Sequence, residues 1–270
     1  MIKKIEHFNL KHIAESGQCF RMNPLNDKSY GIVAFNRFLK VTQIDEERVE
    51  FHCKEEEFNE IWKDYFHLDY DYKGIVEGLR KGDDIFLQEA VNYGGGLRIL
   101  KQEPFEALIS FIISQNKNIP AIKSSIERLS ALYGDKIEAE GNVYYTFPTP
   151  ERLALAEKDV LRTTGLGYRD EYIINTSKAI INKEIDLNEL IGMTHKEAVN
   201  ALLTLHGVGV KVANCVSLYG LHHIDAFPID LWIKRILKEI YNDNFQLELY
   251  EGYAGIVQQY MFYYMRNKDK

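Results

Sequence analysis

Cysteine is scarce in this chain of 270 residues, which contains only Cys19, Cys53 and Cys215. Three scattered thiols exclude a disulfide framework and a four-cysteine cluster of the iron–sulfur kind. We therefore expect the chain to fold by burying apolar side chains, in a reducing compartment. Hydrophobic residues make up 46% of the sequence, which is enough to form one large domain or two modest ones.

Long apolar runs are also absent. No run approaches the roughly 20 residues that a membrane-spanning helix needs. The segment Met1-Ile2-Lys3-Lys4-Ile5-Glu6-His7 lacks the apolar core of a signal peptide. We therefore expect a cytoplasmic protein that makes no contact with a membrane.

An excess of positive charge is missing as well. The chain has 33 Lys and Arg against 40 Asp and Glu, a net charge of −7, which argues against a general nucleic-acid binder with a broad basic surface. Residues 203–239 are close to neutral, with four Lys or Arg against three Asp or Glu. If the chain binds DNA, backbone amides and a few cations must therefore provide most of the contacts.

The sequence pattern changes near residue 100. Three short β-like runs, separated by turn residues, occupy 30–35, 37–43 and 48–53 and predict an antiparallel meander. Residues 98–101 are expected to return a strand to that sheet. Residues 55–65 and 72–79 have helical patterns. We predict an α+β N-terminal domain over residues 1–103, with an antiparallel sheet and flanking helices.

Helical periodicity dominates after Pro104, and we predict an all-α domain over residues 104–270. The expected helices before the glycine-rich turn described below cover 105–115, 119–133, 150–156, 158–163, 169–182 and 188–191.

A glycine-rich turn, Leu205-His206-Gly207-Val208-Gly209-Val210-Lys211, separates two further helical patterns. Glycines at two closely spaced positions permit positive φ and close approach to another chain. The preceding helix has Thr194 as its N-cap, and the following helix covers about 208–218. Residues of about 194–219 therefore form a helix-hairpin-helix, whose second helix presents free N–H groups suited to a phosphate.

Lys211 stands in the first turn of that second helix, where a cation faces the positive end of the helix dipole. An amine in this position is a candidate nucleophile and Schiff-base former. The alternative is a surface lysine that meets a DNA phosphate. Asp230 follows Pro228 and precedes an amphipathic helix, so it is expected to be an N-cap. A rigidly held carboxylate can also stabilise a positively charged sugar while an N-glycosidic bond breaks.

Residues 203–230 resemble the helix-hairpin-helix DNA glycosylases that have a Gly/Pro-rich loop and a catalytic aspartate, and the lysine indicates their bifunctional members. Four more segments resemble 8-oxoguanine DNA glycosylase in that family's order, so that the resemblance covers nearly the whole chain. They are Ser16-Gly17-Gln18-Cys19-Phe20-Arg21, Ser114-Gln115-Asn116-Lys117-Asn118-Ile119, Gly165-Leu166-Gly167-Tyr168-Arg169 and Ala254-Gly255-Ile256-Val257-Gln258-Gln259-Tyr260-Met261-Phe262.

The resemblance implies a DNA glycosylase/AP lyase that excises 8-oxoguanine from double-stranded DNA. It implies a monomer associated with the nucleoid and no redox or nucleotide cofactor. Lys211 and Asp230 would be the catalytic residues. Two alternatives stay open: a glycosylase for another damaged purine such as 3-methyladenine, and a non-catalytic helix-hairpin-helix protein that binds DNA.

Roles in base binding also follow from the resemblance. A base inside a duplex must be extruded into a pocket before it can be released. The Gly17 carbonyl would accept the N7–H that 8-oxoguanine has and guanine lacks, and Gln258 would read the Watson–Crick edge. Phe262 would stack on one face of the base, with Cys215 against the other. Locally, Gly17 is equally typical of a turn, and Phe262 of a helical core position.

Further residues would contact the DNA itself. Asn116 matches the residue that enters the vacated duplex space. Tyr168 resembles an aromatic wedge beside the estranged base, and Arg169 a contact to that base. Gly207 and Gly209 would hold phosphates through their amides.

The family's hairpin also binds a monovalent cation through backbone carbonyls, for which Leu203, Leu205 and Val208 are the candidates. Two positions depart from better-known members. Ala121 stands where those members have an arginine that contacts the opposing cytosine, so we expect weaker selectivity for the opposing base. Trp232 stands where they have a phosphate-contacting histidine, and an uncharged indole would contact DNA more weakly or by stacking.

Overall fold

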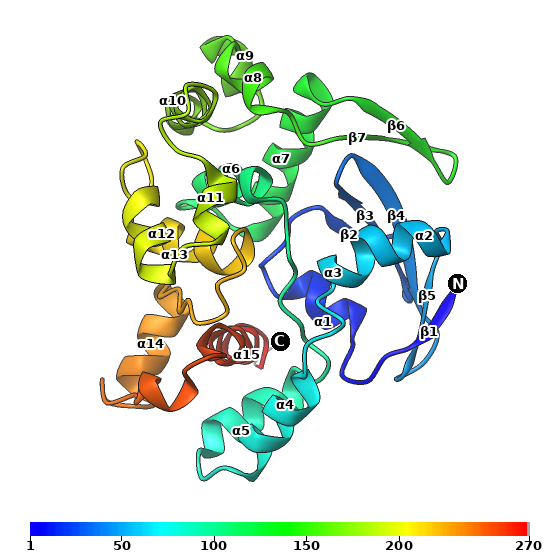
Figure 1. Ribbon diagram of the computed structural model, residues 1–270, viewed down its shortest axis with the longest axis vertical. Coiled ribbons are helices and arrows are strands. Elements are labelled where there is room, and N and C mark those ends of the chain that lie inside the picture. Colours follow the sequence, from blue (N-terminus) through cyan, green and yellow to red (C-terminus); the bar gives the residue numbers. More distant parts are fainter. Residues whose placement is uncertain (269–270) are drawn as a thin grey trace.

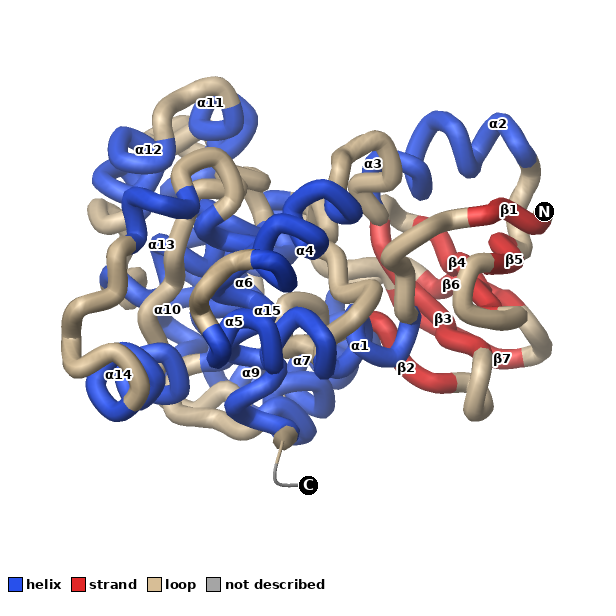
Figure 2. Tube along the Cα trace, turned by 90° about the horizontal axis from the view of Figure 1, so that it is seen from below, coloured by secondary structure: helices blue, strands red, loops and turns tan. Residues whose placement is uncertain are grey.

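The computed structural model describes residues 1–268 and places an antiparallel sheet beside a larger group of helices (Figures 1 and 2). The sheet has the strand order β1-β5-β4-β3-β2. Its strands are β1 (Ile2–Lys4), β2 (Met22–Pro24), β3 (Ser29–Ala34), β4 (Arg37–Gln43) and β5 (Arg48–Phe51). The predicted meander is therefore confirmed, and two strands of three residues each, too short to show alternation, extend it.

The segment predicted as one helix over residues 55–65 is helical throughout but contains a π turn. It consists of α2 (Glu55–Glu57), η1 (Phe58–Trp62) and α3 (Lys63–Tyr65). Phe58, Trp62 and Tyr65 are all buried against the sheet and α1 (Leu10–Glu15).

The strand predicted at residues 98–101 is wrong. The Leu100 N–H donates to Gln18 Oε1 at 2.7 Å, and the Lys101 N–H donates to the Tyr65 carbonyl at 2.9 Å. A side chain and the carbonyl at the end of α3 therefore satisfy these amides, and no strand hydrogen bonds are needed. The segment runs in irregular conformation between the two parts of the molecule.

The helices after residue 103 lie close to the predicted ranges. They are α6 (Pro104–Ser114), α7 (Ile119–Tyr133), α8 (Pro150–Ala154), α9 (Lys158–Thr163), α10 (Arg169–Ile181), α11 (Leu187–Ile191), α12 (His195–Leu202), α13 (Val210–Tyr219), α14 (Leu231–Glu239), the 3-10 turn η2 (Leu247–Tyr250) and α15 (Ala254–Asn267). The predicted α+β part followed by a helical part is confirmed. No helix in residues 1–268 is both long and apolar enough to cross a membrane.

The sequence did not predict the hairpin of β6 (Lys136–Ala139) and β7 (Asn142–Tyr145) in the helical part. It packs on the sheet, where Tyr144 stacks on Phe38 with ring centroids 4.3 Å apart and Lys40 pairs with Glu140 at 2.8 Å. Glu140 adopts φ of +50° in the turn. Glutamate is uncommon at such turn positions, which Asn, Asp and Gly prefer, so the sequence gives little indication of this turn.

Two helices before residue 100 belong to the helical core. These are α4 (Tyr72–Lys81) and α5 (Ile85–Tyr93), and α5 packs against α15 (Figure 1). Their apolar side chains share one buried cluster with α6, α13 and α15, whereas the sheet has its own cluster. The domain boundary near residue 103 stays a prediction. In the structure, α4 and α5 pack with the helical part although they precede that boundary.

The helix-hairpin-helix consists of α12, α13 and the turn between them. Thr194 caps α12 as predicted, in a capping box with Glu197. Helix α13 begins two residues later than predicted, at Val210, because Gly209 is extended (φ −93°, ψ 174°) and serves as its N-cap. Gly207 has φ of +84°, and a Cβ there would lie 2.3 Å from Cγ of Tyr172, so the turn requires glycine at this position.

Candidate active site

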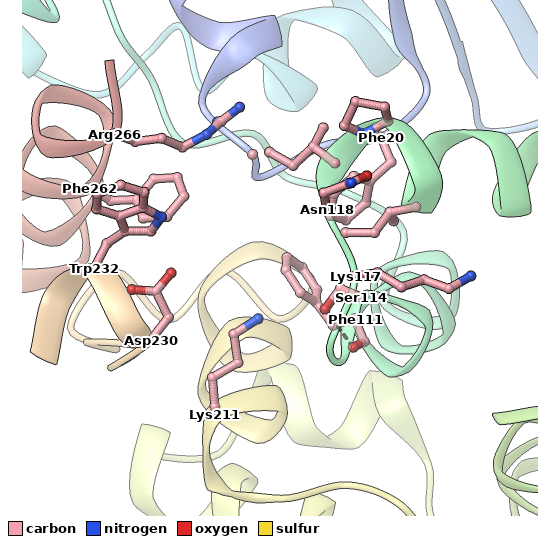
Figure 3. Close-up of a pocket in the computed structure, with 14 residues that line it drawn as sticks. Phe20, Phe111, Ser114, Lys117, Asn118, Lys211, Asp230, Trp232, Phe262 and Arg266 are labelled. Atoms are coloured by element: carbon pink, nitrogen blue, oxygen red, sulfur yellow. Dashed lines mark hydrogen bonds between the residues drawn. The ribbon is translucent and has the colours of Figure 1, made fainter. Parts of the chain in front are cut away.

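A cavity of about 320 Å³ opens between the starts of α13 and α14, helix α15, the loop that carries Gly17, and the end of α6 with the loop that leads into α7 (Figure 3). Five residues singled out in the sequence line it: Gly17, Lys211, Asp230, Trp232 and Phe262. A smaller space of about 50 Å³ shares Gly17, Lys211, Asp230 and Phe262 with it and adds Cys215 and Gln258. The fold thus brings the predicted catalytic and base-binding residues together from both ends of the chain.

Lys211 extends from the first turn of α13 into this cavity (Figure 3). The same helix buries Val212 and Val216 in the core, whereas Lys211 and Cys215, one turn apart, line the cavity side. The Lys211 Nζ lies 5.2 Å from the ring centroid of Phe111, a cation–π geometry that holds the amine without neutralising it. The amine can therefore reach a group placed in the cavity.

Asp230 is the N-cap of α14, as predicted: its Oδ1 accepts the Ile233 N–H at 2.9 Å. The helix is anchored by Ile233 and Ile236, which are both fully buried. The carboxylate faces the same cavity as the Lys211 amine (Figure 3). A fixed anion beside a free amine can stabilise positive charge that develops on a bound group while the amine attacks it.

Gly17 fits both roles considered for it, a turn glycine and a residue of the base-binding pocket. It is a turn glycine with φ of +77°, and it also lines the cavity. A Cβ at this position would lie 3.3 Å from Ile119 Cδ1 and 3.3 Å from Phe262 Cε1, so any larger residue would narrow the space. Buried amides hold the loop, since Gln18 Nε2 donates to the Arg98 carbonyl and Gln102 Nε2 donates to the Gln18 carbonyl, each at 2.7 Å.

Gln258 and Cys215 line the smaller space from α15 and α13. Gln258 is only 3% exposed, and its Nε2 donates to the Pro228 carbonyl at 3.1 Å. Burial raises the pKa of the Cys215 thiol, so the side chain stays neutral and suits contact with the face of a ring. Phe262 lines both spaces.

Asn116 and Tyr168 meet at the surface. Asn116 has φ of +52° and is exposed, and its Nδ2 donates to the Tyr168 hydroxyl at 3.4 Å. The Tyr168 side chain is 52% exposed. The pair predicted to enter the duplex therefore projects from one place, although its two members come from different loops.

Arg169 differs from the expectation of an exposed base contact. It is 6% exposed, its guanidinium donates to the Leu166 and Gln115 carbonyls, and it lies 4.4 Å from the Tyr168 ring centroid. These contacts join the two loops that carry Asn116 and Tyr168. A contact from Arg169 to a DNA base stays a prediction.

The hairpin is tied to the Asn116 loop, because Gln115 Nε2 donates to the Gly207 carbonyl at 3.1 Å. A Cβ at Gly209 would meet no atom within 4 Å, which leaves open space at the start of α13. Such space permits close approach of a phosphate to the helix N-terminus.

The candidate cation site has only neutral donors. The Leu205 carbonyl already accepts the Val208 N–H at 3.1 Å and keeps one lone pair, and the Leu203 and Val208 carbonyls would complete the set. Neutral oxygen donors fit a monovalent cation. The cation site is compatible with this geometry and stays a prediction. In residues 1–268 no three His, Cys, Asp or Glu side chains gather in a way that could hold a metal ion.

Trp232 lies in the cavity wall near Phe262 (Figure 3), so a contact with DNA phosphate stays a prediction for it. Several other wall residues have no role assigned from the sequence. These are Phe20, Phe111, Ile119, Ile122 and Arg266. They have ordinary core or surface patterns and are recognisable as site residues only once α6, α7 and α15 are packed together.

Two family models match the chain in succession. Residues 1–108 match the 8-oxoguanine DNA glycosylase N-terminal domain, and residues 109–248 match the HhH-GPD superfamily of base excision DNA repair proteins. The junction between the matches falls within α6.

Similar proteins agree with these matches. A probable N-glycosylase/DNA lyase of Methanothermobacter thermautotrophicus is 35% identical over 230 residues, which cover 74% of this chain and 72% of the relative. The N-glycosylase/DNA lyase of Saccharomyces cerevisiae is 35% identical over 209 residues, 71% of this chain, and the chain spans only 55% of that protein.

Two solved structures superpose over the whole chain. MBOgg1 in complex with a low-affinity DNA ligand has a TM-score of 0.94 and 40% identity, covering 100% of this chain and 96% of that one. The Clostridium acetobutylicum 8-oxoguanine glycosylase/lyase, bound to double-stranded DNA with cytosine opposite 8-oxoguanine, has a TM-score of 0.93 and 34% identity, covering 100% and 99%. The chain therefore belongs to the HhH-GPD superfamily of base excision DNA repair proteins.

Proposed function

We propose that this protein is a DNA glycosylase and lyase that excises 8-oxoguanine from duplex DNA and then cuts the strand at the abasic site. One observation carries the proposal: Lys211 and Asp230 face a single cavity that Gly17 and Phe262 also line. The Clostridium acetobutylicum enzyme, which shares the fold and is 34% identical, supports the same substrate. We further propose that the protein acts as a monomer on cytoplasmic, nucleoid-associated DNA.

The chemistry follows from the amine and the carboxylate. Asp230 stabilises positive charge on the sugar as the bond between C1′ and the base breaks, and the base leaves with the electron pair. The unprotonated Lys211 amine forms a bond to C1′ and loses a proton, and opening of the sugar ring gives a Schiff base. Loss of a proton from C2′ then expels the 3′ phosphate, and water hydrolyses the imine. No redox step occurs.

Base recognition uses the walls of the cavity. Its volume of about 320 Å³ is at the lower end of the range for small-ligand pockets, as a single extruded base requires. The Gly17 carbonyl accepts the N7–H of 8-oxoguanine, whereas the N7 lone pair of guanine would repel it. Phe262 stacks on the base, Cys215 packs on its other face and Gln258 reads its Watson–Crick edge.

The DNA itself is held by the hairpin and the exposed loops. The amides around Gly207 and Gly209 contact phosphates, Asn116 occupies the space that the base leaves, and Tyr168 stacks beside the estranged base. Ala121 is exposed in the first turn of α7 and offers no charged group to an opposing base, so the protein discriminates weakly at that position.

The test is trapping with borohydride, which reduces the Schiff base to a stable amine. Wild-type protein incubated with an 8-oxoguanine:cytosine duplex and borohydride is expected to give a covalent complex, and Lys211→Gln none. Absence of the complex in the wild type, or its persistence in the variant, would refute the proposal. Release of 3-methyladenine in preference to 8-oxoguanine would assign the same chemistry to a different lesion.

A further inference from the structure

Tyr219, at the end of α13, lines the smaller space beside Gln258 and Cys215 and carries a buried hydroxyl. Its side chain is 5% exposed, and its ring stacks on Phe111 with centroids 5.4 Å apart and planes 19° from parallel. Phe111 in turn supports the Lys211 amine. The ring is thus fixed in place, and the hydroxyl donates a hydrogen bond to Gln259 Oε1 on α15.

Gln259 carries this contact on to the glycine loop. It is 1% exposed, and its Nε2 donates to the Ser16 carbonyl at 2.7 Å. That carbonyl belongs to the peptide bond that enters Gly17. One line of hydrogen bonds therefore runs from α13 through α15 to the residue whose carbonyl faces N7 of the base.

The same hydroxyl lies 3.3 Å from Oε1 of Gln258. A phenol has one proton, and the shorter contact to Gln259 takes it. Neither amide can be turned over, because Nε2 of Gln258 donates to the Pro228 carbonyl and Nε2 of Gln259 donates to the Ser16 carbonyl. Oε1 of Gln258 is therefore left as an acceptor at the smaller space, where it suits the N–H groups on the Watson–Crick edge of a guanine.

The Tyr219 hydroxyl keeps its proton under all ordinary conditions. Burial raises its pKa well above the usual value, and the neighbouring Cys215 and Asp230 act in the same direction. A permanent donor is required here, since a phenolate would repel both glutamine oxygens. The side chain supports the site without itself taking part in proton transfer.

We propose that Tyr219 and Gln259 form a positioning relay that holds the base reader Gly17, so that base excision depends on the Tyr219 hydroxyl while cleavage at an abasic site does not. The inference rests on the proposed function and deepens it. Lyase chemistry at a site that has already lost its base needs Lys211 and Asp230 but no base reader, which separates the two activities.

The first test is Tyr219→Phe, which removes one oxygen and keeps the stacked ring. Under single-turnover conditions, release of 8-oxoguanine is expected to fall about tenfold, because a buried glutamine oxygen loses its donor. Strand cleavage at a preformed abasic site should stay within about twofold of wild type. A general loss of stability would lower both rates together. A fall in the ratio of base release to abasic-site cleavage therefore identifies a positioning role.

Tyr260→Phe is the matched control. Tyr260 neighbours Gln259 on α15, is fully buried, and donates its hydroxyl to the Leu97 carbonyl at 3.2 Å, away from the cavity. The substitution removes the same atom from a similar environment. Both activities should therefore stay within about twofold of wild type.

Gln259→Leu supplies a second, independent variant and should reproduce the selective loss of base release. Because the hydroxyl acts through Gln259, the double variant Y219F/Q259L should release 8-oxoguanine no more slowly than Q259L alone. Additive losses, equal losses of both activities, or full excision by Y219F would overturn the relay. A wild-type protein that fails to release 8-oxoguanine would instead overturn the proposed function on which the relay rests.

Discussion

The Nζ atom of Lys211 lies 5.2 Å from the centre of the Phe111 ring, on the face of α6 that points into the cavity. The Phe111 ring is 3% exposed, and its side chain stacks on Tyr219. The Phe111 ring therefore supports the end of the Lys211 side chain at the cavity, and no ion pair has to be broken before attack on C1′.

Phe111→Leu should slow both base release and cleavage at an abasic site by about three- to tenfold, because the cation–π contact and the support for Tyr219 are lost together. Single-turnover rates measure this. The free energy of unfolding should fall by about 1 kcal/mol, the usual effect of reshaping a well-packed core.

Phe86→Leu is the control for this experiment. Phe86 is another buried ring, 8% exposed and packed against Tyr241, but it does not line the cavity. The variant should lose similar stability and keep both rates. If both variants slow the reaction equally, the aromatic support of Lys211 has no specific role.

Asp230 has two roles that substitution can separate. Asparagine accepts the Ile233 N–H as aspartate does, so Asp230→Asn should unfold at nearly the wild-type denaturant concentration. It lacks the charge, and we expect base release to fall by about 100-fold or more. Asp230→Ala should lose the activity and, in addition, about 1 kcal/mol of stability through the missing cap. A fully active Asn variant would exclude an electrostatic role.

Local patterns in the sequence were sufficient for part of this site. Gly207, Gly209 and Lys211 lie within five residues. The sequence around Asp230 is typical of an N-cap before an amphipathic helix. Such features depend on backbone conformation and helix ends, which short stretches of sequence encode. Their positions in the structure agree with the prediction, apart from a two-residue shift in the start of α13.

Features made by tertiary contacts could not be read in this way. Gln259 and Ser16 are separated by 243 positions in sequence, and nothing local distinguishes Gln259 from a surface glutamine. Arg169 was expected at the start of a helix and in contact with DNA, yet its guanidinium is buried and donates to two carbonyls. The strand expected at 98–101 failed for the same reason: Gln18, from a distant loop, provides the hydrogen bond that a neighbouring strand would have provided.

The two glycines of the hairpin should respond differently to alanine. At Gly207, φ is +84° and a Cβ would overlap the Tyr172 ring at 2.3 Å, so Gly207→Ala should lower the free energy of unfolding by about 1–3 kcal/mol. At Gly209, φ is −93° and the space is open, so Gly209→Ala should fold normally. It should nevertheless weaken binding to an abasic-site duplex, because the added methyl keeps a phosphate from the amides. Unchanged affinity would place the phosphate elsewhere.

Stability at acidic pH should depend on a pair of histidines remote from the cavity. The rings of His67 and His222 are 4.3 Å apart, and neither ring nitrogen of His222 has a hydrogen-bond partner in residues 1–268. Burial, reinforced by nearby cations, lowers the pKa of His67 to about 4, and burial together with His67 lowers that of His222 to about 2. The folded protein keeps both rings neutral at a pH where the unfolded chain protonates them.

The sign of the effect follows. Between the unfolded value of about 6.5 and the folded values, the unfolded chain binds more protons, so the folded state loses stability as the pH falls. Each histidine contributes a slope of up to about 1.4 kcal/mol per pH unit in that window. His222→Asn, whose side chain tolerates the φ of +60° at this position, should unfold with a shallower dependence on pH between 6.5 and 4. Urea unfolding at several pH values measures the slope, and an identical slope in the variant would show that His222 is protonated in the folded protein.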